Sequence, residues 1–71
     1  MEKKTTINGH PVAYDAVAYE GIKYLMERIS DLEAKVFFDQ AYSHGFAMFE
    51  DHSSHKYKLS YHYGEYQLEK A

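Results

Sequence analysis

The stretch from Ser30 to Gly45 constrains the fold of this chain more than any other part of the sequence. It opens with a capping box, Ser30–Glu33, in which the serine hydroxyl can accept from the amide of residue 33 while the glutamate side chain reaches back to the serine amide. Gly45 closes the stretch and suits the left-handed conformation that follows a helix. Between them, apolar residues recur at helical spacing, at Leu32, Val36, Phe37 and Ala41. The sequence therefore predicts a helix over residues 31–44.

After this helix, the segment HKYKLSYHY alternates apolar and polar residues with a period of two, and in FAMFED the same period sets Phe46 and Met48 against Ala47 and Phe49. This period is typical of half-buried strands. A two-residue turn at Ser53–Ser54 would place Asp51 opposite Lys56. The same turn would place Met48 opposite Leu59, so that charged and apolar residues pair in one register. The pattern predicts an antiparallel hairpin.

A second turn is predicted at Gly64–Glu65, because the first central residue of a type II′ turn needs a positive φ, which glycine adopts readily. This turn would set Tyr63 opposite Tyr66. It would also set Tyr61 opposite Leu68. The C-terminal part of the chain is thus expected to form a tyrosine-rich hairpin.

Two interpretations of residues 12–29 stay open. The apolar positions from Ala18 to Ile29 fit an additional helix over 15–29, followed by a three-stranded meander. However, an unbroken helix over 15–44 would be about 45 Å long, whereas a compact domain of this length is roughly 30 Å across. Gly21 would also cost about 1 kcal/mol inside a helix relative to alanine. We therefore favour two strands, near 12–19 and 22–29, joined at Glu20–Gly21.

The N-terminal residues carry fewer signals. Asn8–Gly9 is a strong turn signal, and Pro11 limits what can pair beside it. Residues 1–7 are expected to be loose. The predicted fold class is α+β, with residues 1–71 forming one domain in which a small antiparallel sheet of about five strands is packed by one helix at 31–44.

The composition excludes several classes of protein. The chain has no cysteine and therefore neither disulfides nor thiolate metal sites. Eight Lys and Arg against eleven Asp and Glu give a net charge of −3, which opposes tight binding to a nucleic-acid backbone. No apolar run approaches the roughly 20 residues of a membrane helix, and the polar start lacks the features of a secretory signal. We expect a cytoplasmic protein that binds no membrane.

The signals for catalysis and metal binding are few. There is no cysteine nucleophile, and the glycines are isolated rather than grouped in a phosphate-binding loop. We therefore expect neither enzymatic activity nor a cofactor. Asp51, His52 and His55 are the candidates for a metal site, because the predicted turn at Ser53–Ser54 would bring two imidazoles together. A histidine-based metal-binding protein is one alternative function.

The eight tyrosines say most about function. Tyrosine favours strands and often forms core, yet it is also enriched in protein-binding hot spots. One helix covers only part of a five-stranded sheet. We therefore expect another protein, or a second copy of the chain in a two-fold dimer, to cover the rest. The predicted contact residues are Tyr57, Tyr61, Tyr63 and Tyr66.

The resulting expectation is a small non-catalytic protein-interaction module, a regulator or inhibitor that acts through its tyrosine-rich hairpin. The second alternative is a single-stranded nucleic-acid-binding module in which sheet aromatics stack on bases. Its basic strip would consist of His55, Lys56, Lys58 and His62. The negative net charge and the presence of a single arginine, Arg28, oppose this alternative.

Overall fold

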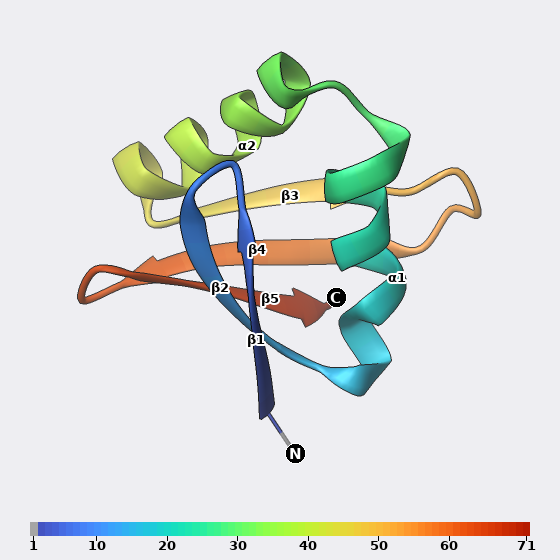
Figure 1. Ribbon diagram of the computed structural model, residues 1–71, viewed down its shortest axis with the longest axis horizontal. Coiled ribbons are helices and arrows are strands. Elements are labelled where there is room, and N and C mark those ends of the chain that lie inside the picture. Colours follow the sequence, from blue (N-terminus) through green and yellow to red (C-terminus); the bar gives the residue numbers. More distant parts are fainter. Residues whose placement is uncertain (1) are drawn as a thin grey trace.

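Helix α2 spans Asp31–His44 in the computed structural model, which describes residues 2–71 (Figure 1). Both halves of the predicted capping box are present: the Glu33 amide donates to the Ser30 hydroxyl over 3.2 Å, and the Ser30 amide donates to the Glu33 carboxylate over 3.3 Å. At the other end, Gly45 adopts a φ of 91° and its amide donates to the Ala41 carbonyl over 2.8 Å. The predicted helix and both of its ends are confirmed, because these caps satisfy backbone groups that a helix end leaves unpaired.

The buried face of α2 differs from the predicted one. Ala34, Phe38 and Ala41 are fully buried, whereas Leu32 is 76% and Val36 is 61% exposed. The two alanines lie one turn before and one turn after the phenylalanine, so the helix can approach the sheet closely along this line. The predicted stripe was wrong at Leu32 and Val36, because apolar residues occupy more than one face of this helix and only the packing partner selects among them.

Five strands form one sheet in the order β1-β2-β5-β4-β3, which confirms the α+β class. The strands are β1 Glu2–Ile7, β2 His10–Asp15, β3 Phe46–Glu50, β4 Lys56–His62 and β5 Glu65–Lys70. The sheet is mixed and not purely antiparallel, since β2 runs parallel to β5, with Val12 beside Tyr66 and Tyr14 beside Leu68. Parallel neighbours need a long connection, which the helices and then β3 and β4 provide (Figure 1).

The favoured hairpin over residues 12–29 was wrong, and the helical alternative holds in a modified form. After β2 the chain forms a 3-10 turn, η1, at Ala16–Ala18, a short helix, α1, at Tyr19–Lys23, and a π-helical turn, η2, at Tyr24–Arg28. Ile29 is extended, with φ −128° and ψ 161°. The two helical segments are therefore separated at Ile29 and do not form one unbroken helix over 15–44. The argument that such a helix would be too long for the domain thus does not exclude a helical segment before Ile29.

Gly21 lies inside α1 and not at the tip of a hairpin. A Cβ atom at this position would lie 2.8 Å from Cδ1 of Tyr57 and 3.0 Å from Cδ2 of Leu68, which are both core side chains. Only glycine leaves enough room for the backbone of α1 to come this close to β4 and β5. The low helix propensity of glycine is thus offset by a close contact that a sequence alone does not reveal.

The hairpin of β3 and β4 forms in a register one residue away from the predicted one. Met48 pairs with Lys58 instead of Leu59. The Asp51 carboxylate accepts from two loop amides and Ser54 has a positive φ of 66°, so the loop is longer than the expected two-residue turn. Because successive side chains point to opposite faces, this shift turns Met48 to the outer face of the sheet.

The hairpin of β4 and β5 turns at Tyr63–Gly64, with φ of 52° and 83°, and not at Gly64–Glu65. Two consecutive positive φ values are the signature of a type I′ turn, whose twist matches that of the flanking strands. Tyr61 therefore pairs with Tyr66, and the predicted pairing of Tyr63 with Tyr66 was wrong. Since the shift is two residues, the same side chains stay on the core face.

Residues 1–7 were expected to be loose. Residue 1 lies outside the described residues, whereas residues 2–7 form β1 and pair with β2 along its length. The predicted turn at Asn8–Gly9 joins the two strands, with φ of 52° and 81°. The Asn8 side-chain amide donates to the Asp31 carbonyl over 3.1 Å. This N-terminal hairpin is thereby attached to the first residue of α2.

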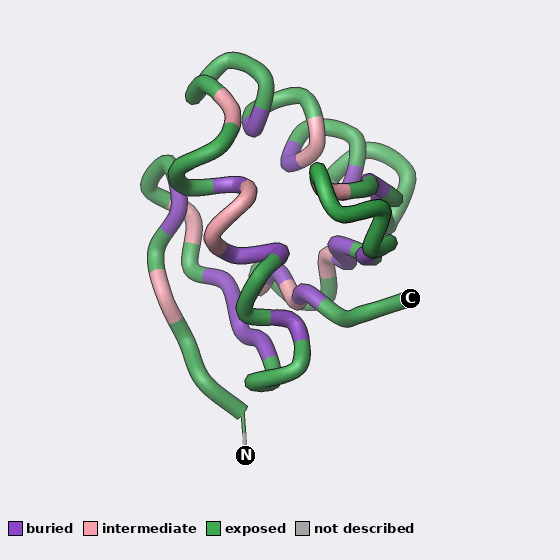
Figure 2. Tube along the Cα trace, turned by 90° about the vertical axis from the view of Figure 1, so that its right-hand side faces the viewer, coloured by how far each residue is buried: buried purple, intermediate pink, exposed green. Residues whose placement is uncertain are grey.

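The core lies between the helical segments and one face of the sheet. Figure 2 shows the buried stretches of strands and helices turned toward a common interior. The largest fully buried side chains are Tyr57, Phe38, Ile22, Leu25, Leu59, Leu68 and Val12. The outer face of the sheet carries mostly exposed side chains. Among residues 2–71, no helix is long and apolar enough to cross a membrane.

Candidate protein-contact site

The four tyrosines predicted to contact a partner separate into two pairs. Tyr57 is 1% and Tyr66 is 6% exposed, so both belong to the core. Tyr61 is half-buried at the border of that core, and Tyr63 is 105% exposed at the tip of the β4–β5 turn. Only Tyr61 and Tyr63 therefore reach a surface that another protein can contact.

Tyr57 is held by a hydrogen bond as well as by packing. Its hydroxyl donates to the Asp51 carboxylate over 3.2 Å. Burial, followed by the charge of Asp51 and this bond, raises the pKa of Tyr57. Burial alone would also raise the pKa of Asp51, but the amides of His55 and Ser53, each 2.9 Å from its carboxylate, outweigh it and leave the pKa of Asp51 below its ordinary value. Asp51 thus fastens the β3–β4 loop to the core.

Tyr66 packs against both Phe38 of α2 and the half-buried ring of Tyr61. Its ring centroid lies 4.9 Å from that of Phe38 and 4.9 Å from that of Tyr61, and its hydroxyl donates to the Phe38 carbonyl over 3.5 Å. Burial raises the pKa of Tyr66, with smaller contributions from Tyr61, Asp39 and Tyr42. The hydroxyl therefore stays protonated at neutral pH and keeps its bond to the helix backbone.

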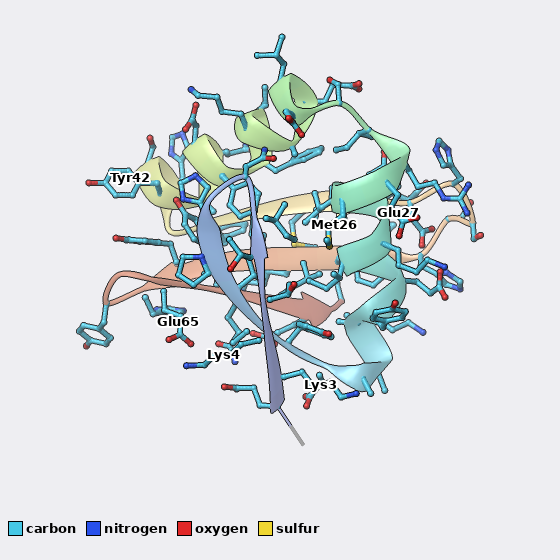
Figure 3. All side chains as sticks on the ribbon, in the orientation of Figure 1. Lys3, Lys4, Met26, Glu27, Tyr42 and Glu65 are labelled. Atoms are coloured by element: carbon cyan, nitrogen blue, oxygen red, sulfur yellow. The ribbon has the colours of Figure 1, made fainter. Side chains whose placement is uncertain are left out.

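Tyr42 lies beside Tyr61, and we call Tyr42, Tyr61 and Tyr63 the tyrosine end. Tyr42 projects from the last turn of α2 (Figure 3), is 64% exposed, and has its ring centroid 5.0 Å from that of Tyr61. The Tyr61 amide donates to the Gly45 carbonyl over 3.1 Å, which fixes the end of α2 beside β4. The tyrosine end therefore lies at the β4–β5 turn, far along the strands from the β3–β4 loop (Figure 1).

Reasoning from the sequence missed Tyr42, although part of the signal was present. Tyr42 precedes Gly45 by three residues, so it had to lie in the last turn of the predicted helix, and the chain reversal at Gly45 brings a strand back beside that turn. The missing part was the strand register, which places Tyr61 next to Gly45.

Tyr63 combines full exposure with an unfavourable backbone conformation. Its φ of 52° lies in the left-handed region, which costs a residue with a Cβ atom roughly 1–2 kcal/mol. The residues favoured at this position of a type I′ turn are asparagine, aspartate and glycine. Because the ring of Tyr63 is 105% exposed, no packing within the chain compensates for this cost.

On the outer face of the sheet, basic residues lie opposite acidic residues of the neighbouring strands. Three cross-strand pairs do so: Glu50 with Lys56, Lys58 with Glu69, and His62 with Glu65. In addition, the ammonium of Lys4 lies 3.5 Å from the Glu65 carboxylate (Figure 3). The basic residues on β4 are therefore flanked by carboxylates, and they do not form a continuous positive surface that would attract a phosphate backbone.

The rings of His52 and His55, the histidines that were candidates for a metal site, contact different groups. His55 Nδ1 lies 3.4 Å from the Asp51 carboxylate, whereas the ring of His52 meets the edge of Tyr24 at a centroid distance of 5.3 Å. Within the described part of the chain, residues 2–71, no group of three or more His, Cys, Asp or Glu side chains is placed to hold a metal ion.

Comparison of the chain with protein-family models, with curated proteins and with solved structures finds no match.

Proposed function

We propose that this chain is a small non-catalytic protein-interaction module, a regulator or inhibitor, whose tyrosine end contacts another protein. The observation that carries the proposal is Tyr63, a fully exposed aromatic ring at a turn position whose φ of 52° disfavours it. Residues held in unfavourable backbone conformations are found preferentially at binding and active sites. The ring of Tyr63 adds nothing to the packing within the chain. A protein contact gives this ring a role that the isolated fold does not.

Tyr42 and Tyr61 supply the remainder of the contact surface. Their rings lie 5.0 Å apart, and Tyr61 rests on the buried ring of Tyr66. A tyrosine held in this way loses little conformational entropy on binding, while its ring offers a large contact area and its hydroxyl offers a hydrogen bond. The tyrosine end thus has the composition and the support of a binding hot spot.

The two alternative functions have less support. The basic residues Lys56, Lys58 and His62 of the predicted strip on β4 are each paired with a glutamate on the neighbouring strand. Single-stranded nucleic acid would therefore meet a carboxylate beside each of these basic side chains. A metal site would need a third ligand beside His52 and His55, and their rings already contact other groups.

Site-specific photo-crosslinking tests the proposal. A benzophenone amino acid at position 63 should give an adduct with a discrete partner in the native cell extract, whereas the same group at Val17, an exposed residue of η1, should give none. The partner identified by mass spectrometry is then produced in pure form. Binding to it should be lost in the double variant Tyr42→Ala and Tyr63→Asn, whose unfolding midpoint should not fall below that of the native chain. Unchanged binding of the purified partner by this variant would refute the proposed site.

We also propose that the protein acts in the cytoplasm, and its self-association stays a prediction. A second copy was expected because one helix could not cover the sheet. The helical residues 16–28 cover part of the sheet face that a second copy was expected to cover. On the outer face of the sheet, the exposed apolar side chains that a second copy could contact are Phe46 and Met48. Sedimentation equilibrium at micromolar concentration distinguishes an 8.3 kDa monomer from a dimer.

A further inference from the structure

The turn between β1 and β2 contains the only asparagine in the sequence, Asn8, followed directly by Gly9. Both residues are exposed, and their φ values of 52° and 81° make them the two central residues of a type I′ turn. The side-chain amide of Asn8 donates to the Asp31 carbonyl over 3.1 Å, where the turn meets the start of α2 (Figure 1). This asparagine therefore takes part in the contact that attaches the N-terminal hairpin to α2.

Asparagine followed by glycine is prone to spontaneous deamidation, because glycine has no side chain to shield its own amide. In this reaction the Gly9 nitrogen attacks Cγ, the side-chain carbonyl carbon of Asn8. A bond forms between these two atoms, the bond from Cγ to Nδ2 breaks, and the proton of the Gly9 amide leaves with Nδ2 as ammonia. Water then opens the resulting five-membered succinimide ring at either carbonyl, which gives aspartate or isoaspartate at position 8.

The folded turn opposes this reaction. The first central residue of a type I′ turn has a positive φ and a positive ψ, whereas the succinimide ring needs a negative ψ at the asparagine. The pairing of Ile7 with His10 fixes the two ends of the turn, so the Asn8 backbone cannot rotate on its own. Moving Cγ toward the Gly9 nitrogen also breaks the hydrogen bond from Nδ2 to Asp31. Ring closure therefore requires that the hairpin first open.

The product of the reaction cannot restore the contact with α2. An aspartate at position 8 has no amide to donate, so it would place a second acceptor opposite the Asp31 carbonyl. Isoaspartate would in addition lengthen the backbone of a two-residue turn, and the length of that turn sets the register of β1 on β2. The buried side chain of Ile7 and the ring of His10, which stacks on Phe38 at 4.9 Å, depend on this register for their places in the core.

We propose that Asn8 is a deamidation site controlled by the opening of the β1–β2 hairpin. Each opening exposes Asn8 to ring closure, and the reaction product weakens the attachment of the hairpin to α2. Because the ammonia is lost, the change runs in one direction and accumulates with the time that the hairpin spends open. Local openings of this kind are ordinary in native proteins, and they are frequent for segments at the end of a chain.

Intact-mass spectrometry of the full chain in mildly alkaline buffer tests the site. Because Asn8 is the only asparagine, a gain of one mass unit with time reports this position. Asn8→Gln should show no gain over the same period, since glutamine closes a larger ring far more slowly. The gain should be slower in the native chain than in the same chain unfolded in urea. Absence of a gain in urea would overturn the site, and equal rates in buffer and in urea would overturn its control by the fold.

Ile7→Val and Ile22→Val form a matched pair that locates the opening. Each variant removes one methyl group from a fully buried side chain, the first in β1 and the second in α1. Ile7→Val should open the hairpin more often and speed the mass gain roughly two- to tenfold. Ile22→Val should deamidate at the native rate. Equal acceleration by both variants would mean that only global unfolding exposes Asn8, and would overturn the control by the hairpin.

Hydrogen exchange tests the consequence for the fold. Asn8→Asp is the aspartate product of the reaction, and the amides of its β1 should exchange faster than those of the native chain, while the amides of β4 should exchange at the native rate. Unchanged exchange in β1 would overturn the inference that the modification weakens the attachment of the hairpin.

Discussion

Replacing Gly21 with alanine sets two known effects against each other. In the interior of a helix, alanine is more stable than glycine by about 1 kcal/mol, so the sequence alone predicts a more stable protein. In the structure, the new Cβ atom would lie 2.8 Å from Cδ1 and 3.0 Å from Cε1 of Tyr57, and 3.0 Å from Cδ2 of Leu68. Non-bonded carbon atoms prefer about 3.5–4.0 Å, so something must move.

The packing effect should win. Tyr57 and Leu68 are each 1% exposed, and the Tyr57 hydroxyl is bound to Asp51, so neither side chain can swing into solvent. Overpacking of this kind costs about 1–3 kcal/mol. After subtraction of the gain in helix propensity, Gly21→Ala should destabilise the protein by up to about 2 kcal/mol. For a domain of this size that corresponds to a fall in Tm of roughly 4–8 °C for each kcal/mol.

Urea denaturation of the native chain, Gly21→Ala, Leu68→Ala and the double variant measures both parts. The penalty of Gly21→Ala should shrink in the Leu68→Ala background, because the shortened side chain removes one of the two contacts. A rise in the denaturation midpoint of the single variant would contradict this prediction, since helix propensity would then outweigh the contact of α1 with the sheet.

Three further perturbations test other parts of the structure. Ser30→Ala removes the helix cap and should lower the free energy of unfolding by about 1 kcal/mol in urea denaturation; an unchanged midpoint would contradict the capping role. Tyr63→Asn relieves the left-handed backbone at the turn tip and should raise that free energy by up to about 1 kcal/mol; a loss of stability would show that the ring packs after all. The Asp51 carboxylate, whose folded pKa lies below 3.8, should stabilise the fold above that pH and lose this contribution as the pH falls through the folded pKa. The stability advantage of the native chain over Asp51→Asn should accordingly be present at pH 6 and diminish below pH 4, and an advantage that grew on acidification would disprove the assignment.

Local signals in the sequence were enough to predict several elements. The capping box at Ser30 and the glycine at position 45 specify a helix through backbone hydrogen bonds within a few residues of each end. The Asn8–Gly9 turn follows in the same way from the ease with which these residues adopt positive φ. The period of two after Gly45 was enough to predict strands, because it requires only that one face be buried.

The remaining features depend on partners that are distant in the sequence, and they become defined only when the chain packs. The sequence around Gly21 resembles a turn, but in the structure the Tyr57 ring of β4 and the Leu68 side chain of β5 leave no room for a Cβ atom there. Likewise, the pattern that predicted strand β4 could not tell whether Tyr57, Tyr61 and Tyr63 face a core, a border or solvent. That choice depended on a one-residue and a two-residue shift of register, and on a second helical segment that fills the space beside Tyr57. Register and helix docking are chosen by the free energy of burying many side chains at once, so no window of neighbouring residues contains the information.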